Sequence, residues 1–516
     1  MAPLDKEVKY DRQLRLWAAN GQAALENSRL ALLHGTAVGT ETLKNLVLPG
    51  IGSYTIIDGQ TVTAQDTGVN FFLDVDSVGA SRAQKTCEYL QELNADVVGS
   101  YLNRDPISLI TDDPAYFVDN FDVVLVTALY GQPLQVLAET LWAAKIPLFV
   151  VDAIGFIGYL RVALPEHNIV ETHPDAIVDL RLDNPWPELS SLAEDLDLES
   201  LNDNQHTHVP YVLLLLHYLA IWKDQHDGNA PKTFDEKSQF KTLIRSGMRN
   251  VDEDNFDEAV NNVWRACSTT NVPSSVQDLF DSPSAQELTP ETDQFWFLVR
   301  AVADFVKTSG KGLLPVAGTI PDMKSDTNTY IQLQKTYRAR AMRDIADIKT
   351  NLLHHLQAHG KPSTAIPESE IESFCKHAGY IKVIRYRSLG QQADEEVARV
   401  KQWMDEDDAP IYWYLAKRAA ETYRTRHRSW PSHKDDALFA QAKDVFSTTT
   451  DEQNVMLERV CREMTRSGFA ELHNIASLMG GVAAQEIIKV ITKQYVPINN
   501  TVIFDGIKSV SAVYAL

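Results

Sequence analysis

The sequence has few of the features that mark zinc-binding, secreted or membrane-spanning proteins. Its four cysteines, Cys87, Cys267, Cys375 and Cys461, lie far apart, so no CxxC zinc spacing exists. The N-terminal residues contain no apolar stretch, so we expect no signal peptide. The most apolar run, residues 209–222, is shorter than the ~20 residues that span a bilayer and predicts a buried helix. An intracellular, reduced protein fits these absences best.

Basic residues are in the minority. The 48 Lys and Arg against 70 Asp and Glu give a net charge of −22 at pH 7. Such a surface repels nucleic acid and anionic membranes, and it favours basic partners or simply solubility. With 516 residues, of which 44% are apolar and 23% charged, the chain is expected to fold into two to four globular domains.

Residues 28–165 alternate between strand-like and helix-like segments. Short apolar runs predict strands, and apolar residues at every third or fourth position predict helices. This alternation predicts an α/β domain with a mostly parallel sheet and helices on both faces. The predicted strands are 29–33, 53–57, 122–127 and 146–151, and the predicted helices are 39–48, 81–93 and 134–144.

The pattern becomes mainly helical from about residue 175. The clearest helix is 327–358, whose apolar stripe predicts a rod roughly 45 Å long. A helix over 475–492 and strands over 501–504 and 509–514 then end the chain.

The two ends are therefore expected to form one domain. Its parts are 1–174 and 461–516, and a helical domain, 175–460, is inserted between them.

The turn after the first predicted strand lacks the closely spaced glycines of a nucleotide-binding fold. Such glycines permit a tight turn and let phosphates approach N–H groups at a helix N-terminus. Here only Gly35 and Gly39 are present, and the side chains of His34, Thr36 and Ala37 would crowd a pyrophosphate. The residues alone predict a Rossmann-like domain with a poor or absent nucleotide site.

Isolated polar motifs add little to this interpretation. Asp58 closes the second strand, where an acid often binds ribose, but Asp-Gly is also a common turn pair. His206 and His208 lack a third ligand to complete a metal site. His354 and His355 are expected at a solvated edge of the long helix. No metal site is therefore predicted.

Five segments stand out as a set, and they are YDRQLRLW at 10–17, LKNLVLPGIG at 43–52, TIID at 55–58, LPVAGTIPDM at 314–323 and GGVAAQEIIK at 480–489. In sequence and spacing they resemble the activating enzymes of ubiquitin-like proteins. The segment at 314–323 resembles the regulatory subunits of the neddylation activating enzyme in particular. The resemblance implies a Rossmann-like, ThiF/MoeB-type adenylation fold, here inactive, with a large and mainly α-helical inserted domain.

The resemblance also implies which chemistry is missing. Active members bind ATP and magnesium, adenylate the C-terminal glycine of a ubiquitin-like protein and pass it to a cysteine as a thioester. Of their G-x-G-G-x-G loop, which falls on 34–39, only Gly39 remains. Their phosphate-facing Asn, Arg and Lys fall on Asp66, Val69 and Arg82. An acid at position 66 would repel triphosphate, and Val69 cannot neutralise it.

Two further catalytic groups have no counterpart. No Asp occurs between Asp122 and Asp152, so the residue that would hold magnesium is missing. None of the cysteines has the Pro-x-Cys-Thr-like context of the family's nucleophile, although Cys267 comes closest. The other three lie inside apolar helical stretches and are expected to be buried.

The N-terminal motif, in contrast, is intact. In homodimeric relatives the Arg of Y-x-R-Q reaches across the interface into the partner's ATP site, and Arg12 matches it. The hypothesis is that Arg12 acts in trans as an arginine finger. The alternative is a local ion pair with Asp11 or Glu7.

The resemblance implies a regulatory subunit that is not an enzyme on its own. It would bind no cofactor, form an obligate heterodimer with the catalytic subunit that holds ATP and magnesium, and meet the ubiquitin-like protein and, transiently, the conjugating enzyme. The apolar faces of 43–48 and 475–491 would form the heterodimer interface. No nucleic-acid or membrane partner is expected, and the expected location is the cytoplasm and nucleus.

Four alternatives stay open at this point. They are a self-sufficient adenylating enzyme, a dinucleotide-dependent oxidoreductase, the equivalent subunit for the SUMO modifier, and a free-standing adaptor. The degraded loop argues against the first two, and the large helical insertion argues against the third.

Overall fold

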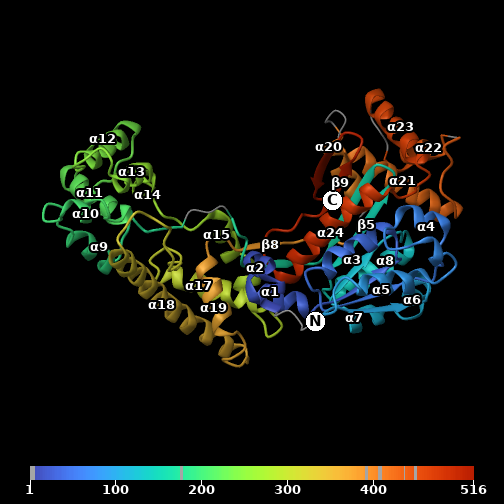
Figure 1. Ribbon diagram of the computed structural model, residues 1–516, viewed down its shortest axis with the longest axis horizontal. Helices are drawn as coiled ribbons and strands as arrows, with labels where there is room; N and C mark the ends of the chain where they lie inside the picture. The colour runs from blue at the N-terminus through green and yellow to red at the C-terminus, as the bar shows by residue number, and fades with distance from the viewer. Residues whose placement is uncertain (1–5, 175–177, 390–392, 405–409, 435, 447–449) are drawn as a thin grey trace. The chain divides into compact units, whose positions relative to one another are not determined.

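The protein folds into two compact units (Figure 1). The computed structural model describes residues 6–174, 178–389, 393–404, 410–434, 436–446 and 450–516. Unit 1 comprises Met1–Ile169 and Val383–Leu516, and unit 2 comprises Val170–Lys382. A two-stranded sheet of β7 (His167–Ile169) and β8 (Lys382–Ile384) marks where the chain leaves unit 1 and returns to it.

The predicted end of the inserted domain is wrong. The sequence pattern placed it at residue 460, whereas the chain rejoins unit 1 at Val383. The stretch 383–460 contains helices at Ala393–Trp403, Ile411–His427 and Ala437–Phe446 and the start of Asp451–Arg466, as its pattern indicated, but apolar side chains of these helices pack into the core of unit 1. Ile411, Leu415 and Leu457 share one buried cluster with Val124 of the sheet. Helical periodicity alone does not tell which core a helix joins.

Unit 1 is built on an eight-stranded sheet in the order β10-β9-β6-β5-β4-β1-β2-β3. The five strands from β5 to β3 run parallel, and β6, β9 and β10 are antiparallel to their neighbours. The strands are β1 (Arg29–Leu33), β2 (Ser53–Ile57), β3 (Val98–Leu102), β4 (Val123–Val126), β5 (Leu148–Ile154), β6 (Ile157–Ala163), β9 (Thr501–Asp505) and β10 (Val510–Tyr514).

Helices cover both faces of this sheet. Leu30 and Leu32 of β1 pack with α2, α3, α5 and α24 on one face, and Ala31 and Leu33 pack with α6, α7, α8 and α21–α23 on the other. The helices of unit 1 are α1 (Lys6–Lys9), α2 (Asp11–Glu26), α3 (Ala37–Val47), α4 (Ala64–Val69), η1 (Val75–Ser77), α5 (Arg82–Gln91), α6 (Pro106–Asp112), α7 (Ala115–Asn120), α8 (Gln132–Ala143), α20 (Ala393–Trp403), α21 (Ile411–His427), α22 (Ala437–Phe446), α23 (Asp451–Arg466) and α24 (His473–Thr492).

Helix α24 is the one helix in the described chain that is long and apolar enough to cross a bilayer. Its Ile475, Met479 and Ile487 are buried in unit 1. Its apolarity is therefore accounted for by a place in the core.

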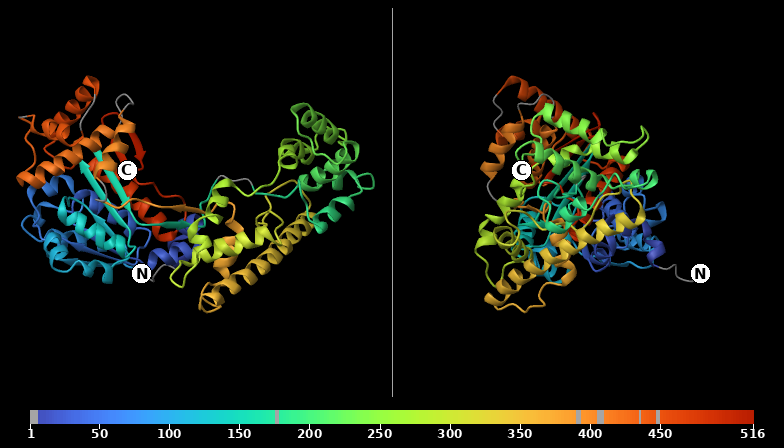
Figure 2. Two further views of the ribbon diagram at one scale, coloured as in Figure 1. Left: turned by 180° about the vertical axis from the view of Figure 1, so that it is seen from behind. Right: turned by 90° about the vertical axis from the view of Figure 1, so that its left-hand side faces the viewer.

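Unit 2 is mainly helical, and its longest helix, α18, runs as one continuous rod (Figure 2). Leu333, Tyr337, Ile348 and Leu352 form the buried stripe that the sequence predicted for it. The helices of unit 2 are α9 (Pro187–Glu194), α10 (Asp203–His206), α11 (Tyr211–Gln225), α12 (Phe234–Arg245), α13 (Asp254–Asn261), α14 (Val263–Cys267), α15 (Ser274–Phe280), α16 (Pro283–Gln286), α17 (Gln294–Lys307), α18 (Thr327–Ala358) and α19 (Glu368–His377).

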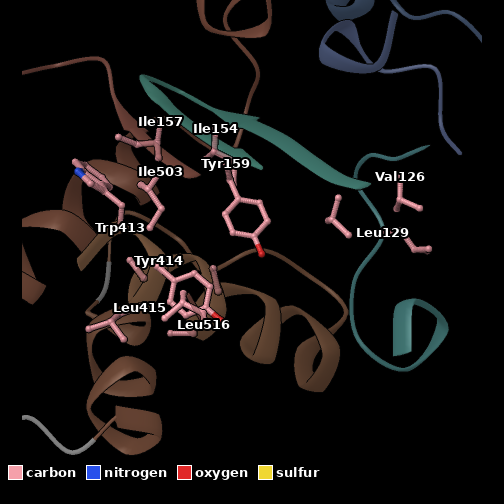
Figure 3. Close-up of a cluster of buried hydrophobic side chains, with 14 of the residues drawn as sticks. Val126, Leu129, Ile154, Ile157, Tyr159, Trp413, Tyr414, Leu415, Ile503 and Leu516 are labelled. Atoms are coloured by element: carbon pink, nitrogen blue, oxygen red, sulfur yellow. The ribbon is translucent and has the colours of Figure 1, made fainter. Parts of the chain in front are cut away.

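Helix α21 packs on β9, and its side chains also contact β5 and β6 (Figure 3). Trp413, Tyr414 and Leu415 of this helix gather beside Tyr159 of β6 and Ile503 of β9. The rings of Tyr159 and Tyr414 stack with their centroids 6.3 Å apart. This packing holds the polar side chains of α21 at the carboxyl ends of β4 and β5, where a Rossmann-like fold binds its ligand.

Candidate functional site

The N-terminus of α3 is the place where a nucleotide fold receives phosphate, because its first N–H groups have no partner inside the helix. In this protein the first two of these N–H groups form hydrogen bonds with another part of the same chain. The N–H groups of Ala37 and Val38 donate to the two carboxylate oxygens of Glu471, at 2.8 Å and 3.0 Å. Thr36 caps the same helix through its side chain, which accepts from the N–H of Gly39. A carboxylate of this chain therefore occupies the phosphate position.

Glu471 belongs to the connection between α23 and α24, far from α3 in sequence. Burial raises the pKa of its carboxyl, and the two N–H donors of α3 oppose that shift. The loop that it contacts is fixed as well. His34 adopts φ +64° and its Nδ1 lies 3.0 Å from the carbonyl oxygen of Thr127, at the end of β4. The hydroxyl of Thr36 donates to that of Thr127 at 3.0 Å. The loop 34–39 is thus tied down without a nucleotide.

Gly39, the one glycine kept from the family loop, has a packing role. A Cβ at this position would lie 2.8 Å from a methyl carbon of Leu32 on β1. Real Cβ atoms do not approach so closely, so only glycine lets α3 lie directly on the sheet.

The ribose position is closed by a second group of contacts. Asp58 is fully buried and accepts from the N–H groups of Gly35 and Gln60, each at 2.8 Å, and from Nε of Arg82 at 2.7 Å. Arg82 also reaches Asp66 at 3.2 Å. Burial alone would lower the pKa of Arg82, but these two carboxylates raise it. The acid and the cation that would face a nucleotide therefore neutralise one another.

A third group fills the position where the magnesium-binding acid is missing. Ala128 follows β4, and its N–H donates to Oδ1 of Asp152 at 3.1 Å. The other oxygen of Asp152 lies 2.8 Å from Nζ of Lys417, which also pairs with Glu421. Burial lowers the pKa of Lys417, but Asp152 and Glu421 outweigh it and raise that pKa. This buried triad is Asp152, Lys417 and Glu421.

Val69, the remaining position of the former ATP site, is half-buried at the end of α4, and its carbonyl oxygen lies 3.0 Å from Nδ1 of His473. Around the site five carboxylates, those of Asp58, Asp66, Asp152, Glu421 and Glu471, take the place of phosphate charge. Within the described residues no group of three His, Cys, Asp or Glu side chains has metal-binding geometry. These residues do not fit ATP and magnesium.

Comparison with known proteins gives the family. The model of the ThiF family matches residues 10–512. The chain is 41% identical to the NEDD8-activating enzyme E1 regulatory subunit of Xenopus laevis, with 99% of each chain covered. It is 40% identical to that of Gallus gallus, over 99% of this chain and 98% of the relative. It is 37% identical to that of Arabidopsis thaliana, over 98% and 95%. The chain belongs to the ThiF family, among the NEDD8-activating enzyme E1 regulatory subunits.

Membership of this ThiF group confirms the family and the Rossmann-like fold with a large helical content that the sequence predicted. It favours the neddylation group over the SUMO group and over a dinucleotide-dependent oxidoreductase.

The four cysteines of this ThiF-family chain lack the environment of a thioester nucleophile. Cys87, Cys375 and Cys461 are buried, and Cys267 is half-buried. Burial raises the pKa of every one, to about 11 for Cys267 and to about 12 for Cys375 and Cys461. Since the thiolate is the nucleophile, none is activated.

Alkylation is expected to be slow at Cys267, the most accessible of the four. A rise from 9.0 to about 11 lowers the thiolate fraction near neutral pH roughly 100-fold. Iodoacetamide labelling of the native chain, followed by peptide mass spectrometry, measures this rate. Labelling of Cys267 as fast as that of free cysteine would contradict its assignment as an inert thiol.

Arg12 lies in the first turn of α2 and is exposed. The side chain of Tyr10 anchors this turn, since its hydroxyl contacts Asn94 and Asp96 at 3.1 Å each. Asp11, which the sequence offered as a local partner for Arg12, pairs with Arg15 at 3.0 Å. Within the described chain Arg12 itself has no hydrogen bond or ion pair. Its guanidinium is available to another chain.

Two of the histidines considered as metal ligands or edge residues, His206 and His355, make structural contacts in unit 2. His206 is buried and its Nδ1 lies 2.8 Å from Glu253. His354 is exposed, as predicted for a solvated edge, but His355 is half-buried with Nε2 2.7 Å from Asp304. Each partner is a carboxylate, so these contacts hold helices together.

Proposed function

We propose that this chain is the regulatory, non-catalytic subunit of the activating enzyme for the ubiquitin-like protein NEDD8. In this role it binds the catalytic subunit, which holds ATP and magnesium, and helps to form the site of adenylation and thioester transfer. The names of its relatives support this assignment. We extend the proposal to a cytoplasmic and nuclear location, which imaging of a tagged chain tests.

The observation that carries the proposal is the pair of hydrogen bonds from Ala37 and Val38 to Glu471. A nucleotide could reach the N-terminus of α3 only by displacing this carboxylate. It would then meet Asp58 and Asp66 without a free cation, because Arg82 already pairs with both. The negative carboxylates of this site would repel the negative phosphates of a nucleotide and so strongly disfavour its binding.

Arg12 is proposed to act in the ATP site of the catalytic subunit. In adenylation, a carboxylate oxygen attacks the α-phosphorus, the phosphoanhydride bond breaks, and pyrophosphate leaves with the electron pair. Negative charge grows on the leaving oxygens, and a planar cation supplied by a second chain stabilises it. The exposed guanidinium at the start of α2 is of the right kind for that role.

The heterodimer surface is proposed on α2, α3 and α24. The sequence pointed to the apolar faces of 43–48 and 475–491, but Leu43 and Leu46 are buried in this chain's own core. The apolar side chains left outward are Leu16, Leu48 and Leu478, which are 52%, 49% and 44% exposed. Helices α3 and α24 pack on each other, as do α2 and α24, so these leucines belong to one helical layer. An obligate interface there would bury about 2,000 Å² or more.

Calorimetric titration of ATP with magnesium tests the assignment. The isolated chain is expected to give no binding heat at millimolar nucleotide, whereas the complex with its catalytic subunit is expected to bind one ATP. The catalytic subunit alone provides the control for the stoichiometry. Saturable binding of ATP by the isolated chain would show that Glu471 does not close the site, and the self-sufficient enzyme would become the better assignment.

A further inference from the structure

Unit 2 contains a cleft of about 480 Å³ that has no part in the nucleotide site. Two irregular segments line it, residues 268–273 between α14 and α15 and residues 314–319 after α17. The second segment belongs to the stretch 314–323 that resembled the regulatory subunits most specifically. Nothing in the adenylation chemistry uses it.

The wall at 314–319 is fixed at one end and has open backbone groups at the other. The N–H of Val316 donates to Asp344 at 3.0 Å, and the carbonyl oxygen of Leu314 accepts from Arg181. Beyond these anchors, the N–H groups of Ala317 and Thr319 have no partner in the part of the chain that the structure describes. Gly318 between them has φ +74°, so the two N–H groups stand in a turn, where each can donate to an oxygen of a bound peptide.

Aromatic side chains add an apolar surface to the cleft. Trp264 and Tyr380 line it and are 42% and 38% exposed. The guanidinium of Arg265 lies over the Trp264 ring, 4.8 Å from its centroid, and its Nη1 donates to the carbonyl oxygen of Val178 at 2.7 Å. The indole therefore stands in a fixed position, and a bulky side chain of a ligand can pack on it.

The cleft is basic in a chain whose net charge is −22. Arg181, Arg265 and the exposed Lys376 line it. Among its described lining residues the one carboxylate is that of Asp179, which Arg181 pairs at 2.6 Å. A locally positive cleft attracts carboxylates of a ligand. Its charge is opposite in sign to the net charge of the protein, so an acidic ligand is expected to prefer this region.

We propose that this cleft binds an extended segment of a partner protein that carries carboxylates and a bulky apolar side chain. The backbone of 317–319 pairs with the segment, Lys376 faces a carboxylate, and Trp264 packs on the apolar side chain. This site is separate from the nucleotide edge of unit 1, and the proposal holds whether or not the assigned enzyme subunit role does.

The probe is a fluorescein-labelled peptide of alternating Glu and Leu, titrated into the full-length chain by fluorescence anisotropy. We expect saturable binding and slower hydrogen exchange of the amides at 317–320. Lys376→Glu is expected to weaken binding about five-fold, the effect of reversing one charge at the edge of an interface. Lys335→Glu is the matched control, since Lys335 is exposed on α18 outside the cleft and changes the net charge equally.

Five results would overturn the proposal. The first two are the absence of binding at millimolar peptide and exchange protection confined to other segments. The next two are equal binding of a peptide with Lys in place of Glu and equal effects of the two Lys variants. The fifth is equal binding of a peptide of alternating Glu and Ser, because charge alone would then be recognised and the cleft would be a site for small anions.

Discussion

Arg12→Ala is expected to lower ATP–pyrophosphate exchange by the heterodimer about 10²–10³-fold while leaving heterodimer formation intact. The reason is that the guanidinium would act only in the transition state, where charge builds up on the leaving pyrophosphate. The side chain is exposed and has no hydrogen bond or ion pair within the described chain, so its removal is expected to leave this subunit's stability close to wild type. Exchange is measured with labelled pyrophosphate at saturating ATP.

Arg15→Ala supplies the matched control on the same helix. Arg15 is exposed and its guanidinium pairs with Asp11 at 3.0 Å, so its loss removes a surface ion pair of small energy. Exchange in this variant should stay close to wild type. If Arg12→Ala and Arg15→Ala exchanged equally well, the trans role of Arg12 would be wrong.

Lys417→Met is expected to destabilise unit 1 by about 3–5 kcal/mol and to lower its Tm by roughly 6–12 °C. The substitution keeps the volume of the side chain but leaves Asp152, which is 4% exposed, without its cation, and leaves Glu421, which is 7% exposed, with Arg418 alone at 3.2 Å. Thermal unfolding, followed together with hydrogen exchange in α21, measures the effect.

Neutralising the whole triad separates charge from shape. The triple variant Asp152→Asn, Lys417→Met, Glu421→Gln removes all three charges at once, so no ion is left buried alone. It should be more stable than Lys417→Met by several kcal/mol, because the cost lies in the unpaired carboxylates. A single variant as stable as wild type would mean that water reaches the triad and that the site is not closed.

Local sequence patterns predicted much of the sheet and the longest helix. The strands 29–33 and 53–57 and the helix 327–358 have the bounds that the apolar runs indicated. In each of these elements, the spacing of its own apolar residues determines which face is buried. The antiparallel strand β6 and the return of the chain at Val383 were missed, because both depend on pairing and packing with distant segments.

For the candidate site, the sequence predicted only which residues of an active ATP site are missing. The sequence showed that the glycines of 34–39 and the magnesium-binding Asp were missing, but not what replaces them. Glu471 reaches α3 across 433 positions of sequence, and no local pattern marks such a contact. Lys417 and Glu421 left a weak signal, since two charges four residues apart stand in a helix that is otherwise apolar at its start. Their meeting with Asp152 required the fold.

ATP–pyrophosphate exchange by this chain alone, by the catalytic subunit alone and by the reconstituted complex tests the central claim most directly. With the cognate ubiquitin-like protein present, we predict exchange by the complex, none by this chain, and at most a trace by the catalytic subunit without Arg12. Exchange by this chain alone would contradict the account, because a nucleotide would then have displaced Glu471 from the N-terminus of α3.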